Sequence, residues 1–138
     1  MKKRVPVSKI MSENPVTLAP HHSLTEAENL FQDYHIRHIP IVENGQLIGV
    51  LSRSDILKVS STEFDEEENK IEAIVFDQFT IPQVMTKHPV TVTANTTIQE
   101  TARILALQSF NALPVLDKGK LVGIVTSTDL IGYLLDQY

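Results

Sequence analysis

The chain has 138 residues, of which 42% are hydrophobic and 21% charged, and this composition supports a packed globular fold of one domain or two small ones. It contains no cysteine, which excludes disulfides, thiol nucleophiles and cysteine-ligated zinc, and no apolar run reaches the roughly 18 residues of a membrane span. With a net charge of -5 and no basic stripe or signal-peptide pattern, we expect a cytoplasmic protein that binds neither nucleic acid nor membranes.

The sequence repeats itself with an offset of 74 residues. Residues 10–57 align without gaps to residues 84–131, with ten identities in 48 positions, where about three would arise by chance at ordinary residue usage. Glycine, proline and aspartate, the residues with least positional freedom, fall in register. The identical pairs are Met11/Met85, Pro15/Pro89, Val16/Val90, Thr17/Thr91, Glu26/Glu100, Pro40/Pro114, Gly45/Gly119, Leu47/Leu121, Gly49/Gly123 and Asp55/Asp129.

Each repeat begins with a short extended segment, residues 15–18 or 89–92, and continues with a helix. Ser23 and Thr97 precede these helices, and a glutamate three residues later completes the spacing of a capping box, in which hydroxyl and carboxylate satisfy unpaired N–H groups. Apolar residues at helical spacing predict one buried face on each helix. They are Leu24, Ala27, Leu30, Phe31 and Tyr34 in the first repeat, and Ile98, Ala102, Ile104 and Leu105 in the second.

Two strands joined by a tight turn follow, and a second helix ends each repeat. A unit of about 50 residues buries too little surface to be very stable alone, so we expect the two copies to bury their sheet faces against each other. The predicted class is α/β (α+β), with the order β-α-β-β-α twice. The strands, turn glycines and helix starts are 39–42, Gly45, 47–51 and Asp55, then 113–116, Gly119, 121–125 and Asp129.

An acidic connection separates the repeats. Residues 58–80 carry seven acids and two bases, a net charge of -5, which equals that of the whole chain. Residues 66–79 have a helical pattern with Ile71, Ile74, Val75 and Phe79 on one side, and the acidic run is more typical of a solvated face than of a binding site. We therefore divide the chain into residues 1–58, an acidic and partly helical linker over 59–80, and residues 81–138.

Two heptads carry a family resemblance. GVLSRSD at residues 49–55 and GIVTSTD at residues 123–129 fit the pattern glycine-hydrophobic-x-Ser/Thr-x-x-Asp. The doubled unit with these motifs resembles a pair of CBS domains, the Bateman module, over about residues 7–135. This resemblance implies two tandem β-α-β-β-α domains packed through their sheets with pseudo-two-fold symmetry, and a regulatory function rather than an enzymatic one.

The heptad also has a direct chemical interpretation. It leaves a strand and opens a helix, whose N-terminal N–H groups and partial positive charge attract phosphate. Ser52 or Thr126 can donate to a phosphate oxygen, and Asp55 or Asp129 can accept hydrogen bonds from both hydroxyls of a ribose. The glycines would allow close backbone approach. The alternative is that these residues are only helix caps.

The resemblance implies two ligand sites, in which the heptad of one repeat holds ribose and phosphate and the other repeat holds adenine. They are not equivalent, because Arg53, Arg37 and His38 are candidate phosphate partners that belong to the first repeat, so we expect the Asp55 site to bind the more anionic ligand or to bind more tightly. One site would combine Ser52, Arg53 and Asp55 with Val90, Phe110, Asn111, Ala112 and Pro114; the other, Thr126, Ser127 and Asp129 with Val16, Ile36, Arg37, His38 and Pro40.

No catalytic or metal-binding pattern stands out. His21-His22 and His35-x-x-His38 have metal-like spacing, but no third and fourth ligands are visible, and His35 near a helix end fits a favourable dipole interaction. The chain lacks a P-loop, HExxH and GxSxG. We therefore expect no enzyme, no metal and no required cofactor.

The leading interpretation is a sensor of energy or metabolite state that binds AMP, ADP or ATP and acts on an unknown effector protein in trans. One alternative is a structural or oligomerisation module that binds no ligand. Another is a sensor of a different adenosyl ligand, such as S-adenosylmethionine, or of a cyclic dinucleotide. The resemblance also implies a homodimer, with contacts through the helices beginning at Leu24, Ile56, Ile98 and Leu130.

Overall fold

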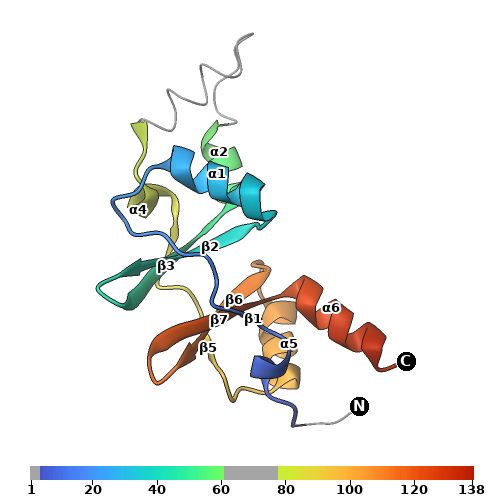
Figure 1. Cartoon of the computed structure of the whole chain (residues 1–138). Helices are drawn as coiled ribbons and strands as arrows, with labels where there is room; N and C mark the ends of the chain where they lie inside the picture. The colour runs from blue at the N-terminus through green and yellow to red at the C-terminus, as the bar shows by residue number, and fades with distance from the viewer. Residues whose placement is uncertain (1–3, 61–77) are drawn as a thin grey trace. The chain divides into compact units, whose positions relative to one another are not determined.

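A computed structural model describes residues 4–60 and 78–138, which fall into two compact units (Figure 1). The first unit is Val16–His88, and the second consists of Met1–Pro15 together with Pro89–Tyr138. Most of the helix expected over residues 66–79 lies outside the described residues. Within those residues no helix combines the length and hydropathy needed to cross a membrane.

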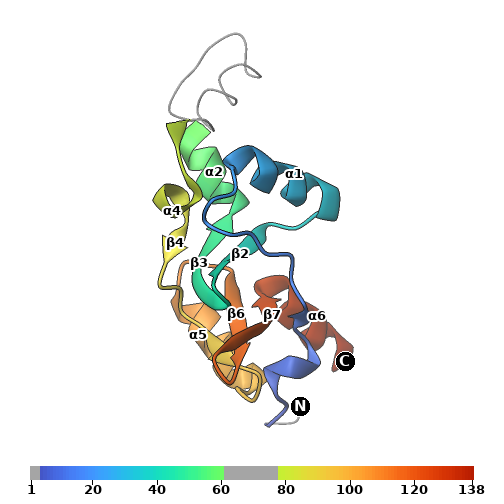
Figure 2. The ribbon, with the colours of Figure 1, turned by 60° about the vertical axis from the view of Figure 1, so that its left-hand side comes forward.

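The first unit contains a three-stranded antiparallel sheet in the order β2-β3-β4. Figures 1 and 2 show α1 and α2 side by side, and each contacts a strand of this sheet. An isolated parallel bridge between Leu18 and Ile41 adds a fourth backbone segment. The elements are α1 (Leu24–Tyr34), β2 (His38–Glu43), β3 (Gln46–Ser52), α2 (Arg53–Ser60), α4 (Ile81–Val84) and β4 (Thr86–Lys87).

The second unit repeats this plan with a four-stranded sheet in the order β1-β7-β6-β5. Strand β5 is parallel to β6, and the other pairs are antiparallel. The predicted mixed α/β class is confirmed, although the first extended segment of the first repeat is reduced to the Leu18 bridge. The elements are the 3-10 helix η1 (Val7–Lys9), β1 (Ser12–Glu13), β5 (Val92–Thr93), α5 (Ile98–Leu107), β6 (Ala112–Asp117), β7 (Lys120–Thr126) and α6 (Ser127–Asp136).

Two-residue turns close both hairpins, as the glycine positions predict. Asn44 and Gly45 have φ values of 51° and 77°, and Lys118 and Gly119 have values of 52° and 80°. Two consecutive positive φ angles define the turn whose twist matches that of the flanking strands. Glycine adopts this conformation without steric cost, which explains its presence at both turns.

The segment that leads into each repeat packs in the unit of the other repeat. Val7 precedes the first repeat, yet it is fully buried in the second unit, where its N–H donates to the carbonyl of Thr96 at 2.7 Å. Its counterpart 74 residues later, Ile81, is fully buried in the core of the first unit. Strands β1 and β4 follow these residues and pair with β7 and β3. Each compact unit is therefore built from both halves of the chain.

The buried faces of the helices agree with the predicted pattern, with two differences. Leu24, Ala27 and Phe31 of α1 are buried, but Tyr34 is 58% exposed, so its place on the apolar face was predicted wrongly. In α5 the polar Thr101 is fully buried beside Ile98 and Leu105. Its hydroxyl donates to the carbonyl of Thr97 at 2.9 Å, which removes the cost of burying an unpaired polar group.

The predicted capping boxes of α1 and α5 are only half formed. The hydroxyls of Ser23 and Thr97 accept the N–H groups of Glu26 and Glu100 at 3.0 and 3.1 Å, as expected. However, the Glu100 carboxylate accepts from the Thr97 hydroxyl, and that of Glu26 lies 3.9 Å from His22. In the part of the chain that the structure describes, neither carboxylate reaches the N-cap backbone, so the reciprocal half of the prediction was wrong.

The heptad glycines are required by packing. A Cβ atom at Gly49 would overlap the sulfur of Met85 and lie 2.9 Å from the carbonyl oxygen of Thr86. Gly123 has the same surroundings, with Met11 and the carbonyl of Ser12 in these places. Because Met85 and Met11 belong to the leading segments, these glycines allow β4 and β1 to lie against β3 and β7.

We predict that Gly49→Ala lowers the free energy of unfolding by about 1–3 kcal/mol, because backbone of β4 lies too close for the added methyl group. Gly132→Ala is the control, because no atom lies within 4 Å of a Cβ built there in α6. That variant is expected to be as stable as the wild type or slightly more stable. Urea unfolding measures both, and an unchanged midpoint for Gly49→Ala would show that the contact is not tight.

Candidate functional site

Both heptads occupy the junction between a strand and a helix, as their sequence predicts. Strand β3 ends at Ser52 and α2 begins at Arg53, while β7 ends at Thr126 and α6 begins at Ser127. The first N–H groups of a helix have no partner within the helix itself, so at such a junction they depend on groups outside it. The two heptads therefore present the same backbone geometry in the two units.

Reciprocal hydrogen bonds hold each junction. Asp55 N–H donates to Ser52 Oγ at 3.1 Å, and Ser52 N–H donates to Asp55 Oδ2 at 2.9 Å. In the second unit Asp129 N–H donates to Thr126 Oγ1 at 3.2 Å, and Thr126 N–H donates to Asp129 Oδ2 at 2.9 Å. These are the complete capping boxes that α1 and α5 lack.

The capping and ligand-binding interpretations are compatible. A cap uses one oxygen of the carboxylate, and among the described residues Oδ1 of Asp55 and Asp129 has no hydrogen-bond partner. A hydroxyl that accepts an N–H still carries its own donor, although in the first junction Ser52 Oγ lies 3.0 Å from Ser54 Oγ, so that one of these two hydroxyls donates to the other. Each junction therefore presents an oriented carboxylate oxygen beside a hydroxyl, which is a suitable arrangement for a diol next to an anion.

Several of the remaining candidate residues lie beside the heptad of their own repeat. His38 is paired with Ser52 across the hairpin, and Arg53 N–H donates to the carbonyl of Arg37 at 2.9 Å. Equivalent contacts join Ala112 to Thr126 and Ser127 to Asn111, the latter at 2.9 Å. The first unit thus holds Val16, Ile36, Arg37, His38, Pro40, Ser52, Arg53 and Asp55, and the second holds Val90, Phe110, Asn111, Ala112, Pro114, Thr126, Ser127 and Asp129.

The candidates differ in the surface that they offer. Pro40 and Pro114 are buried within β2 and β6, which leaves their side chains little area for a ligand. Arg37, Arg53 and Asn111 are exposed, and Val90 is 46% exposed. The family resemblance implies that the heptad of one repeat shares a ligand with the adenine-binding residues of the other repeat. This pairing stays a prediction.

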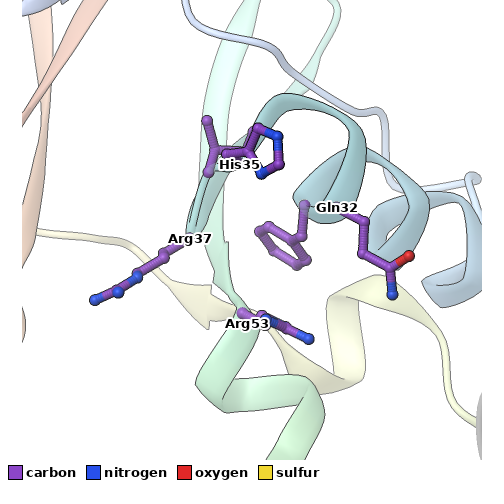
Figure 3. A pocket seen from close by; sticks show the side chains of 6 residues that line it. Gln32, His35, Arg37 and Arg53 are labelled. Carbon is purple, nitrogen blue, oxygen red and sulfur yellow. The ribbon is translucent and has the colours of Figure 1, made fainter.

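A hollow opens beside the first heptad, between the end of α1 and the start of α2. Its volume is about 390 Å³, and its lining combines the aromatic ring of Phe31 with cationic and polar side chains. Figure 3 shows Arg37 and Arg53 on different sides of the hollow, with His35 at a third position around it. The residues that line it are Phe31, Gln32, His35, Ile36, Arg37 and Arg53.

The Glu28 carboxylate, which is not part of the lining, contacts two polar side chains of the hollow. Arg53 Nη2 lies 3.3 Å from Glu28 Oε1, and the amide of Gln32 donates to the same oxygen at 3.1 Å. The Glu28 side chain is 18% exposed and that of Arg53 49% exposed. Sequence reasoning missed Glu28, Gln32 and His35. The available signal was the comparison of repeats, in which Ala102 replaces Glu28 and Ser127 replaces Arg53.

His38 is the residue of the site with a shifted pKa. Burial lowers the pKa of His38 below its usual value of 6.5, the charge of Asp55 raises it in part, and Arg37 lowers it further. The net effect favours a neutral imidazole near neutral pH. In the second unit its place is taken by Ala112, so this ionisable group is specific to the first repeat.

The predicted histidine pairs do not form a metal cluster. The rings of His21 and His22 lie 4.3 Å apart, and His22 Nδ1 accepts the N–H of Ala19 at 2.9 Å. His35 ends α1 in the left-handed conformation, with φ 53°. Over residues 4–60 and 78–138, no three histidine, aspartate or glutamate side chains come together as ligands would.

We predict that the stability of the protein falls as the pH drops below about 6.5, because the unfolded chain binds a proton at His38 more readily than the folded chain. His38→Asn removes this dependence, so its unfolding free energy changes less between pH 7.5 and pH 5. His21→Asn, which alters an exposed ring, keeps the wild-type slope. Urea unfolding over this pH range measures all three, and equal slopes for His38→Asn and the wild type contradict the prediction.

Comparison with known proteins agrees with this geometry. The CBS domain family matches residues 7–62 and 81–136. The uncharacterized protein MJ1225 of Methanocaldococcus jannaschii is 32% identical over 130 residues, which are 94% of this chain and 42% of that protein. A CBS domain-containing protein of Dictyostelium discoideum is 28% identical over 134 residues, covering 96% of this chain and 92% of its own length.

A solved structure gives the same result. The CBS domain pair of protein MJ0100 superposes with a TM-score of 0.83 at 26% identity, covering 98% of this chain and 99% of that one. The match thus extends over both units and includes both strand-to-helix junctions. The chain belongs to the CBS domain family and carries two tandem CBS domains.

Proposed function

We propose that this CBS pair is a regulatory module that binds adenosine ligands, with AMP, ADP and ATP as the leading candidates. The observation that carries the proposal is the matched pair of capping boxes, each with an aspartate Oδ1 left for a ligand beside a hydroxyl. One carboxylate oxygen can accept from a ribose diol while the other maintains the cap. The hydroxyl and the N-terminal helix turn then lie where an attached phosphate would be stabilised.

A relative of known structure supports the adenosine part of this ligand. The CBS domain pair of MJ0100 was solved in complex with 5'-methylthioadenosine and S-adenosyl-L-methionine, which share an adenosine group. S-adenosylmethionine is therefore the second candidate. Phosphate is favoured at the first heptad because the guanidinium groups of Arg37 and Arg53 line the adjoining hollow.

The proposed output is a change in a partner protein rather than a reaction. Asp55 and Asp129 are engaged in helix caps and lie in two closely similar junctions, an arrangement that suits paired recognition sites better than the acid and base of one catalytic centre. Binding of a ligand would change the packing of the repeats, and the partner protein would bind the changed surface with a different affinity. A cytoplasmic location, proposed from composition, is consistent with a nucleotide ligand.

Self-association is the second part of the proposal. Ile131, Leu134 and Leu135 of α6 are 58%, 42% and 66% exposed, and their spacing places them on one side of the helix. Leu107 at the end of the neighbouring α5 is 78% exposed. A second copy of the chain would cover such a surface with an identical one, as two-fold symmetry requires. We propose that this α6 surface forms a homodimer contact.

We predict that the wild type binds AMP, ADP or ATP with a Kd on the order of micromolar, measured by calorimetric titration. Asp55→Asn and Asp129→Asn each weaken one site about ten- to a hundredfold, because a charge-assisted hydrogen bond to the ribose is lost. Asparagine keeps an oxygen for the cap, so these variants remain folded, whereas alanine would also remove the cap.

S-adenosylmethionine is titrated in parallel. Binding of this ligand alone would replace the phosphate part of the proposal with the second candidate. A folded protein that releases no heat with any of the four ligands would overturn the adenosine proposal and favour a module that serves only in assembly.

We predict that Leu135→Glu raises the dissociation constant of the dimer at least about tenfold, because a buried, unpaired carboxylate replaces an apolar contact. Gln137→Glu is the control, since it adds the same charge one residue beyond the same helix and also loses the amide hydrogen bond to the Tyr133 carbonyl, so it shows whether charge or disruption of the helix end is enough to weaken the dimer. Analytical ultracentrifugation measures both. The dimer contact lies elsewhere if Leu135→Glu sediments as the wild type does, or if both variants weaken the dimer equally.

A further inference from the structure

The cationic side of the hollow in the first unit contains its own competing anion. Arg53 extends from the start of α2 toward Gln32 on α1, and Figure 3 shows these two side chains on the same side, with Arg37 directed away from them. Both Arg53 and Gln32 contact Glu28 Oε1, at 3.3 and 3.1 Å. Glu28 itself is outside the lining of the hollow. The guanidinium that a ligand phosphate would meet is thus already neutralised in part.

The second repeat has neither member of this ion pair. Ala102 occupies the position of Glu28, Ser127 that of Arg53, and Ala106 that of Gln32. The two junctions share the same capping box, at Ser52 and at Thr126. The charge and its competitor therefore occur together in one repeat and are absent together from the other.

We infer that Glu28 is a specificity-determining residue, which makes the anion site of the first unit discriminate against ligands of high negative charge. This inference rests on the proposed nucleotide function and refines it. A bound phosphate must draw Arg53 away from Glu28 and tolerate the nearby carboxylate. Because the repulsion grows with the charge of the ligand, a di- or triphosphate is weakened more than a monophosphate, while a neutral nucleoside is unaffected.

The energetics make such competition reversible. The Arg53 side chain is 49% exposed, and an ion pair this accessible to water is weak enough for a ligand anion to replace it. Gln32 keeps Glu28 oriented when Arg53 leaves, because its amide donates to the same carboxylate. The carboxylate therefore continues to repel a ligand phosphate that Arg53 has approached, and it repels a triphosphate more than a monophosphate.

Glu28→Gln tests the inference. The affinity for AMP is expected to rise roughly three- to tenfold, that for ATP to rise more, and that for adenosine to stay unchanged, because the competing charge is removed while the size of the side chain is kept. The gain must shrink as salt is added. Glu26→Gln is the matched control, since it removes the same charge from the same helix but from a side chain that lies near His22.

Arg53→Gln shows whether the effect passes through the guanidinium. In that background Glu28→Gln is expected to give no more than half of its gain. The inference is overturned if Glu28→Gln leaves AMP affinity unchanged or lowers it, if Glu26→Gln gives the same gain, or if the gain persists in full without Arg53. A loss of thermal stability without any change in anion affinity would also overturn it, because Glu28 would then only connect α1 to α2.

Inorganic tripolyphosphate separates this inference from the proposed function. If no nucleoside or nucleotide binds, the proposed function fails, and the tripolyphosphate affinities of the wild type and Glu28→Gln still test the charge competition. Tighter binding of tripolyphosphate to Glu28→Gln than to Glu26→Gln supports it, and equal binding overturns it. Shifts of the Arg53 side-chain resonances in NMR spectra report whether the anion reaches this residue.

Discussion

The reciprocal cap between the last residue of the hairpin and the third residue of the helix is the interaction on which each unit depends. It fixes the angle at which α2 leaves β3 and α6 leaves β7, because both the hydroxyl and the carboxylate are held by backbone N–H groups at 2.9–3.2 Å. In the proposed ligand sites, the same hydrogen bonds would orient the aspartate for a ligand. Removing either side chain therefore affects local stability and recognition together.

The exchange of leading segments places a second constraint on the same heptads. Met85 and Met11 lie against Gly49 and Gly123, so the first residue of each heptad is in contact with a segment that precedes the other half of the chain. A movement of the leading segment would therefore displace or loosen the strand that ends in the heptad. This provides a physical route by which occupancy of a junction and the position of a leading segment can influence each other.

The backbone follows the repeat closely, whereas the charges do not. Left-handed residues recur 74 positions apart at Asn14 and His88, and the hairpin turns match to within a few degrees. Against this symmetric framework, Glu28, Arg53, Arg37 and His38 occur only in the first repeat. Two junctions with one geometry and different charge are suited to distinguishing two ligands, or two states of phosphorylation of one ligand.

Much of this arrangement could be predicted from the sequence, because glycine, proline and aspartate at fixed spacing have few structural alternatives. Gly45 and Gly119 predicted the hairpins, and the heptads predicted the strand-to-helix junctions. The exchanged position of Val7 and Ile81 could not be predicted, because an apolar residue at a segment end does not specify which half of the chain buries it.

Other features depended on tertiary detail. The Arg53–Glu28 ion pair joins residues 25 positions apart on two helices, and only the packing of α1 against α2 brings them together. The unformed capping boxes show the same limit. Glu26 and Glu100 have the required spacing, but the Glu26 carboxylate lies beside His22 and the Glu100 carboxylate accepts from the Thr97 hydroxyl. Spacing identified the candidates, and local competition decided between them.

The most direct test of the central claim is a titration of AMP and ATP into isotope-labelled protein, followed by amide NMR. The account predicts that resonances of residues 52–55 and 126–129 shift in a saturable way, while those of the exposed turns at Gly45 and Gly119 remain unchanged. Saturable shifts confined to other parts of the chain, or none at either junction, would contradict the assignment of the two capping boxes as ligand sites.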